Sequence, residues 1–116
     1  MKFASNNSSI LINHTAFNNN ASTASANNQG GGAIAYIQNS GTGALNINNS
    51  IFNYNSSMAD GGAILNHLAT LVNIRNSFFH NNFTSDDGGA VYNNRVDNCQ
   101  IANSVFYTNT SMDAGG

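Results

Sequence analysis

One stretch of the sequence recurs at a fixed interval, and this repeat constrains the fold more than any other feature. Residues 44–62 read ALNINNSIFNYNSSMADGG, and the same pattern returns 27 positions later in residues 71–89 and again in residues 98–116. A looser copy, SILINHTAFNNN, runs from Ser9 to Asn20. Self-similarity at a period of about 20 to 50 residues is typical of proteins built from stacked repeats.

Inside each repeat the apolar residues alternate with polar ones, which indicates short β-strands. Leu45 and Ile47 flank Asn46, and the equivalent residues of the next copy are Val72 and Ile74 around Asn73. No stretch shows the apolar spacing of an amphipathic helix. A further short segment follows each Gly-Gly pair and another contains the repeated Phe, so we predict about three strands and three turns per repeat.

A single repeat is too short to bury its apolar side chains alone, but successive repeats can bury them by stacking. Each strand would then pair in parallel with the equivalent strand of the next repeat. We expect a polar lead-in over residues 1–8, followed by about four coils over residues 9–43, 44–70, 71–97 and 98–116, with a five-residue insertion in the first loop. The chain would stop mid-repeat, as a fragment of a longer solenoid whose flanking coils are its neighbours.

Stacking predicts columns of equivalent side chains. The expected aromatic column contains Phe17, Phe52, Phe79 and Phe106. Asparagines can pass side-chain hydrogen bonds along such a column, and the candidate asparagine ladders are Asn20, Asn55, Asn82 and Asn109, and Asn49, Asn76 and Asn103. Cys99 takes the place of Leu45 and Val72, so we predict a buried thiol.

Composition excludes several classes of protein. Only 7% of residues are charged, the net charge is -2, and the fixed cations are Lys2, Arg75 and Arg95, so there is no basic face for nucleic acid. The sequence contains no run of about 18 apolar residues, which a membrane-spanning helix would need. The 24 asparagines are compatible with a disordered segment, but the regular placement of Phe, Ile, Leu and Val favours order.

Two motifs carry a resemblance to a known family. The first is Gly-Gly-Ala-Ile, present as residues 31–34 and 61–64 and, with Val in the last place, as residues 88–91; the second is Phe-x-x-Asn, present as residues 17–20, 52–55, 79–82 and 106–109. This pattern resembles the polymorphic outer-membrane protein repeats of bacterial autotransporter adhesins and, more widely, the right-handed parallel β-helix of pectin-lyase-like proteins. The resemblance implies an all-β, right-handed parallel β-helix.

The resemblance also implies a location and a role. We expect a secreted or cell-surface scaffold associated with the outer membrane, whose signal and anchor are not in this chain and whose partners are a host-surface protein or a glycan. The alternative is a set of non-catalytic coils from a polysaccharide lyase or glycoside hydrolase, because the same fold carries such enzymes. We predict no catalytic and no cofactor-binding residues in this chain.

The acidic residues are the only candidates for a metal site. Asp60, Asp86, Asp87 and Asp113 lie just before Gly-Gly pairs and would gather at one edge of the stack, where they could bind Ca2+. We favour the interpretation that they cap backbone N–H groups in turns. His14, His67 and His80 occupy three different repeat positions, which argues against a shared metal.

The remaining polar and aromatic residues have simpler interpretations. We expect Arg75 to be solvent-exposed and Arg95 to form a surface ion pair with Asp97. Tyr36, Tyr54, Tyr92 and Tyr107 are either exposed rings that stack on sugars or half-buried members of columns, and the second interpretation is favoured.

Overall fold

A computed structural model describes residues 1–39 and 42–115 of the protein. The chain forms four parallel β-sheets. Each sheet contains four strands, and the described residues form no helix. Sheet A contains β1 (Lys2–Ser5), β5 (Ile34–Gln38), β9 (Ile64–His67) and β13 (Val91–Asn94). Sheet B contains β2 (Ser9–Asn13), β6 (Ala44–Asn48), β10 (Leu71–Arg75) and β14 (Asn98–Ala102). Residues 40, 41 and 116, which belong to the first and last predicted repeats, lie outside the described residues.

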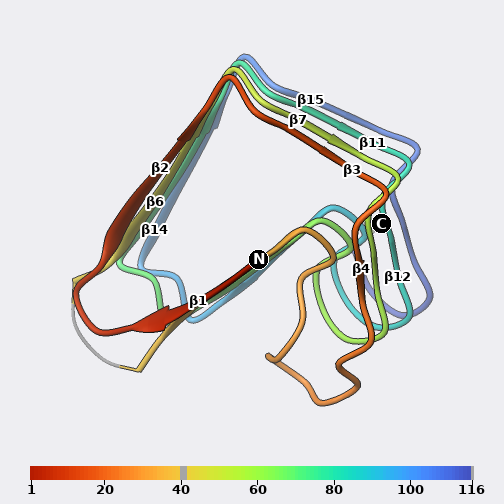
Figure 1. The fold of residues 1–116 in the computed structure, drawn as a ribbon, viewed down its shortest axis with the longest axis horizontal. Helices are drawn as coiled ribbons and strands as arrows, with labels where there is room; N and C mark the ends of the chain where they lie inside the picture. Colours follow the sequence, from red (N-terminus) through yellow and green to blue (C-terminus); the bar gives the residue numbers. More distant parts are fainter. Residues whose placement is uncertain (40–41, 116) are drawn as a thin grey trace.

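The other two sheets are built from shorter strands. Sheet C contains β3 (Ala16–Asn18), β7 (Ile51–Asn53), β11 (Phe78–His80) and β15 (Val105–Tyr107). Sheet D contains β4 (Ala21–Ser22), β8 (Ser56–Ser57), β12 (Phe83–Thr84) and β16 (Thr110–Ser111). The chain visits sheets A, B, C and D in that order four times (Figure 1), and we call these passages coils 1 to 4.

Strand pairing follows the sequence repeat. Val72 pairs with Leu45 in one neighbouring strand and with Cys99 in the other, each exactly one repeat away, and all inter-strand pairs are parallel. The predicted parallel stacking of repeats is therefore confirmed. The molecule measures 32 × 31 × 20 Å, and the shortest dimension runs along the stack (Figure 1), as expected for four strands spaced about 4.8 Å apart.

The number of strands per coil and the start of regular structure differ from the prediction. Each coil has four strands rather than three, because a two-residue strand such as Ser56–Ser57 forms within the segment read as a polar turn. Regular structure also begins before Ser9, since β1 pairs with β5 and sets Phe3 opposite Tyr36. Residues 2–5 occur once, without a preceding Gly-Gly pair, so the repeat pattern could not mark them.

The corners between sheets use residues in the left-handed backbone conformation. The corner between sheets B and C contains His14, Asn49, Asn76 and Asn103, with φ between 49° and 50°. Figure 1 shows this corner as the sharp bend that joins β2 to β3. Asparagine tolerates this conformation better than other residues with a side chain.

The second predicted asparagine ladder is therefore wrong. Asn49, Asn76 and Asn103 are exposed, and among the described residues no hydrogen bond joins their side chains to one another. The Nδ2 atom of Asn49 instead donates to Oδ1 of Asn13, and the backbone N–H groups of Asn49 and Asn76 bond to the next coil. These residues are repeated because of their backbone conformation.

The interior is filled by the predicted columns. Successive rings of Phe17, Phe52, Phe79 and Phe106 stack with centroids 4.6–4.9 Å apart and interplanar angles of 10° or less. In sheet B, Leu45, Ile47, Val72 and Ile74 are fully buried beside this column.

Equivalent residues of coil 4 are exposed because β14 and β15 have a neighbouring strand on one side only. Ile101 is 49% exposed and Phe106 is 41% exposed. Cys99 is also exposed, so the predicted burial of its thiol is wrong in this chain. Its column position is buried only where a further coil covers it, as at Leu45 and Val72.

The first predicted asparagine ladder runs along the corner between sheets C and D. The Nδ2 atoms of Asn20, Asn55 and Asn82 each donate to Oδ1 of the equivalent asparagine in the next coil, at 2.8–2.9 Å. Asn55 and Asn82 are buried. A ladder of this kind satisfies amide groups in the interior, where unpaired polar groups are costly.

Candidate functional site

The outer face of sheet C carries exposed aromatic rings. Strands β7, β11 and β15 point Phe52, Phe79 and Phe106 inward, so the residues on either side of each Phe point outward. We call this surface the aromatic strip; it comprises Ile51, Tyr54, Phe78, His80, Val105 and Tyr107. The exposed fractions of Tyr54 and Tyr107 are 56% and 59%.

His80 is at the centre of the strip. Its ring stacks on Tyr107, with centroids 5.1 Å apart and an interplanar angle of 6°. Phe78 lies 5.6 Å from the His80 ring, and Tyr54 meets it edge-on at 6.1 Å. These contacts hold four rings in one continuous surface that spans coils 2 to 4.

Amide side chains fix the His80 ring and border the strip. The Nδ1 atom of His80 lies 3.2 Å from Oδ1 of Asn53 and 3.0 Å from Nδ2 of Asn81. Asn81 in turn accepts a hydrogen bond at Oδ1 from the Thr108 hydroxyl. The surface therefore offers flat apolar rings next to hydrogen-bonding groups.

The favoured interpretation of the tyrosines holds for two of the four. Tyr36 is buried and Tyr92 is half-buried in sheet A. Tyr54 and Tyr107 are exposed instead, because Tyr107 follows the inward Phe106 on β15 and Tyr54 lies at a left-handed corner with φ of 53°. The sequence repeat does not single out Phe78, whose outward position follows from its place next to Phe79.

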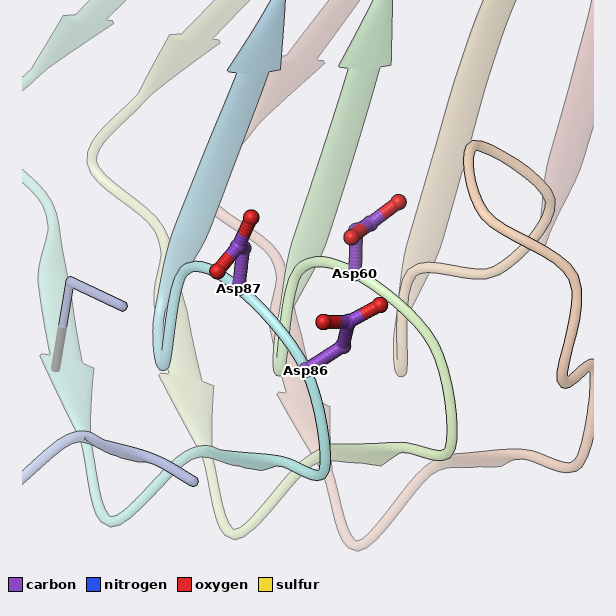
Figure 2. A group of neighbouring side chains, drawn as sticks. All are labelled: Asp60, Asp86 and Asp87. Atoms are coloured by element: carbon purple, nitrogen blue, oxygen red, sulfur yellow. The ribbon is translucent and has the colours of Figure 1, made fainter. Parts of the chain in front are cut away.

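An acidic cluster lies at the turns that lead into sheet A. One carboxylate oxygen from each of Asp60, Asp86 and Asp87 lies within 4.8 Å of the others. Figure 2 shows these side chains on the turns of two successive coils, with Asp86 close to both neighbours. Asp113 is outside this group of three, so the structure brings together three of the four predicted acidic residues.

Backbone capping accounts for two of these carboxylates. Asp60 Oδ2 accepts the N–H of Asn28 at 2.7 Å, and Asp87 Oδ1 accepts the N–H of Ala114 at 3.1 Å. Ca2+ takes about six to eight oxygen ligands, whereas this cluster supplies three carboxylates of which two already serve turns. The capping interpretation explains more of the geometry than a Ca2+ site does.

The crowded charges have an electrostatic consequence. Partial desolvation, together with the charges of Asp60, Asp87 and Asp113, raises the pKa of Asp86. Burial and the carboxylates of the cluster also raise the pKa of the Tyr92 phenol. Asp86 therefore holds a proton more readily than an isolated aspartate does.

Other candidate residues are dispersed. His14, His67 and His80 lie at a corner, at the end of β9 and at the end of β11. Arg75 is exposed and donates to Oε1 of Gln100 at 3.3 Å. The predicted Arg95–Asp97 ion pair is absent from the described residues, and Arg95 occupies a left-handed corner. The pKa of His67 is lowered, mainly by burial of its ring and also by the charge of Arg95.

A cavity of about 340 Å³ lies at coil 1, beside the loop that contains the five-residue insertion. Its lining consists mainly of glycine, alanine and serine, together with Met1, Lys2 and Gln29. Lys2 Nζ donates to Oε1 of Gln29 at 3.3 Å. The lining supplies one cationic side chain and no carboxylate, imidazole or thiol, which makes this cavity a poor match for acid–base chemistry.

Comparison with family models, curated proteins and solved structures gives no match to this chain. The described residues contain no helix of the length and apolar character needed to cross a membrane.

Proposed function

We propose that this chain is a segment of a secreted or cell-surface adhesive scaffold, and that it binds glycans through the aromatic strip. The fold we propose is a right-handed parallel β-helix like that of the polymorphic outer-membrane protein repeats. The four parallel sheets support this fold, and right-handed crossovers between parallel strands predominate in proteins generally.

The observation that carries the proposal is the continuous surface of four rings on one face of the stack. An aromatic ring has a negative face that attracts the weakly positive C–H groups of a sugar ring. Asn53 and Asn81 border the rings with amide groups that can bond to sugar hydroxyls. Rings and amides together suit a glycan better than a purely apolar partner.

The repeated geometry supports an adhesive mode of binding. Exposed rings lie on three neighbouring coils, so one extended polymer chain can contact several of them at once. Weak contacts then combine into a higher overall affinity. A shallow face of this kind needs no deep pocket and no catalytic group.

Retention on immobilised glycans tests the proposal. The triple variant Tyr54→Ser, Phe78→Ser, Tyr107→Ser removes three rings that are exposed, so the fold should persist by circular dichroism. Leu11→Ser is the matched control, because Leu11 is 66% exposed on sheet B. We expect binding of neutral and acidic polysaccharides to weaken at least tenfold in the triple variant only. Unchanged retention would contradict the proposal, and binding to host proteins without glycans would assign the strip to a protein partner.

A further inference from the structure

The Nδ1 atom of His80 lies between two amide groups that make opposite demands on it. It is 3.2 Å from Oδ1 of Asn53, which only accepts hydrogen bonds, and 3.0 Å from Nδ2 of Asn81, which only donates them. A neutral imidazole carries either a proton or a lone pair at Nδ1, never both. The neutral ring therefore satisfies one of the two amides and leaves the other without its bond.

A protonated ring satisfies both amides after one rearrangement. Its Nδ1 carries a hydrogen, which donates to Asn53 and repels the amide hydrogens of Asn81. A half-turn of the Asn81 amide exchanges Nδ2 for Oδ1, so that both amides then accept from the ring. The Thr108 hydroxyl donates to Oδ1 of Asn81 at 2.6 Å in the structure and would accept from Nδ2 after the turn. Each of these polar groups then has a partner.

The aromatic neighbours of His80 also suit a positive charge. The centroids of the His80 and Tyr107 rings are 5.1 Å apart, and the ring planes differ by 6°. A cation within about 6 Å of an aromatic face is attracted to it. The Phe78 ring lies 5.6 Å away on the same strand. These contacts favour the protonated ring without neutralising its charge.

No fixed charge borders His80 within the part of the chain that the structure describes. The side chains around it, on β7, β11, β15 and the adjoining corners, are polar or aromatic, and only the two tyrosines among them titrate: Asn53, Tyr54, Phe78, Asn81, Tyr107 and Thr108. The nearest charges along the chain, Arg75 and Asp86, belong to sheet B and to the acidic cluster. A charge on His80 would therefore lack a counter-charge until a ligand supplied one.

The other ring nitrogen of His80 is open to a ligand. Nε2 makes no hydrogen bond within residues 1–39 and 42–115, and it is not buried. His80 lies on coil 3, with Asn53 of coil 2 on one side and Tyr107 of coil 4 on the other. Its surroundings therefore do not depend on where the stack begins or ends.

From this arrangement we propose that His80 is the residue by which the aromatic strip recognises the anionic group of a glycan, such as a carboxylate or a sulfate. The inference rests on the glycan binding proposed above. The protonated ring donates from Nε2 to the anion, while Nδ1 is held by Asn53 and Asn81. Histidine side chains gain their charge between about pH 5 and 8. Binding of an anionic glycan therefore strengthens as the pH falls through this range, whereas binding of an uncharged glycan does not.

Two single variants give a matched test. His80→Asn introduces the residue that the equivalent position of coil 2 already has, Asn53. His14→Asn does the same at the corner between sheets B and C, where the equivalent residue of coil 2 is Asn49. Each variant removes one imidazole and inserts an amide that the fold accommodates. Dextran sulfate and dextran are the ligands, because they share a backbone and differ in charge.

Retention on the two immobilised polymers is measured at pH 8 and at pH 5. We expect wild type and His14→Asn to bind dextran sulfate at least about fivefold more tightly at pH 5, from one charge-assisted hydrogen bond. The same ratio should stay below about twofold in His80→Asn, and for dextran in all three proteins. A pH effect in His80→Asn equal to that in wild type would overturn the proposal, as would a wild type whose retention does not change.

The side-chain amide of Asn81 reports the rearrangement without any ligand or variant. Its Nδ2 protons should shift with pH in an NMR titration of the wild type, with the same midpoint as the His80 ring protons. An Asn81 amide that ignores the titration of His80 would contradict the proposal. Retention that the triple ring variant loses but that pH leaves unchanged would overturn this inference alone, whereas a wild type that binds neither polymer would overturn the proposed function with it.

Discussion

The Oδ1 atom of Asn82 accepts two hydrogen bonds from Asn55, one from its backbone N–H at 3.0 Å and one from its Nδ2 at 2.9 Å. The Nδ2 atom of Asn82 donates in turn to Phe52 O at 3.0 Å and to Oδ1 of Asn109 at 2.8 Å. One buried side chain thus bonds coils 2 and 4 to coil 3. The ladder is a structural element as much as the apolar columns are.

Asn82→Ala should be strongly destabilising. The change leaves buried donors of Asn55 without an acceptor, and each unpaired buried group costs about 1–3 kcal/mol. We expect a loss of about 3 kcal/mol or more in the free energy of unfolding, measured by urea denaturation. Asn98→Ala, at an exposed position of β14, is the control and should lie within about 0.5 kcal/mol of wild type. Equal effects would show that the ladder does not stabilise the stack.

Adjacent phenylalanines on β11 provide a matched pair. Phe79 is fully buried between two rings, whereas Phe78 is 38% exposed. Phe79→Ala should cost about 3–5 kcal/mol of unfolding free energy, and Phe78→Ala less than about 1 kcal/mol. Arg75→Ala, on an exposed residue, should be nearly neutral. The reverse order of the two phenylalanine variants would mean that the inner and outer faces of sheet C are wrongly assigned.

Gly62 permits close contact between turns. A Cβ atom there would lie 1.9 Å from the carbonyl oxygen of Gly89 in the next coil. Gly62→Ala must therefore push two coils apart, and overpacking of this kind costs about 1–3 kcal/mol or more. At Gly115 the nearest atom would be 3.9 Å away, so Gly115→Ala should lose only about 1 kcal/mol, from its left-handed backbone. Melting temperatures that fall equally in both variants would contradict this steric explanation.

The acidic cluster predicts a pH effect on stability. Because the pKa of Asp86 is raised in the folded protein, the folded state binds this proton more tightly than the unfolded chain does. Its contribution to stability is therefore greatest below the unfolded value of about 3.8 and declines as pH rises through the raised folded value.

Asp86→Asn removes this dependence. The variant should melt at a higher temperature than wild type at neutral pH, and the difference should shrink as the pH falls toward about 4. Asp97→Asn, at an exposed site outside the cluster, serves as the control. Thermal melts over this pH range provide the measurement. A difference that grows on acidification would show that the cluster stabilises the charged form of Asp86.

Features that recur in every repeat were predictable from the sequence. Phe52 and Phe79 occupy equivalent positions of successive repeats, as do Asn55 and Asn82, and stacking explains both pairs. Corner residues such as Asn76 recur as regularly but for a backbone reason, and the sequence does not distinguish that reason from a side-chain ladder. The φ of 49° does.

Features that occur once, or that depend on neighbours, were not predictable. Strand β1 has no second copy of its sequence, and β8 consists of two serines that read as turn. Cys99 is exposed because, among the residues that the structure describes, no strand pairs with the outer edge of β14. The aromatic strip was missed because Phe78 and Tyr107 vary between repeats, so periodicity gives no signal for them.

In-register stacking of repeats underlies the fold and positions the aromatic strip. Nuclear Overhauser effects between backbone amide protons test it most directly in isotope-labelled protein. We expect cross-peaks between equivalent residues of neighbouring repeats, such as Val72 with Cys99 and Phe52 with Phe79. A spectrum with the narrow amide dispersion of a disordered chain, or cross-strand contacts in a different register, would contradict the stacking.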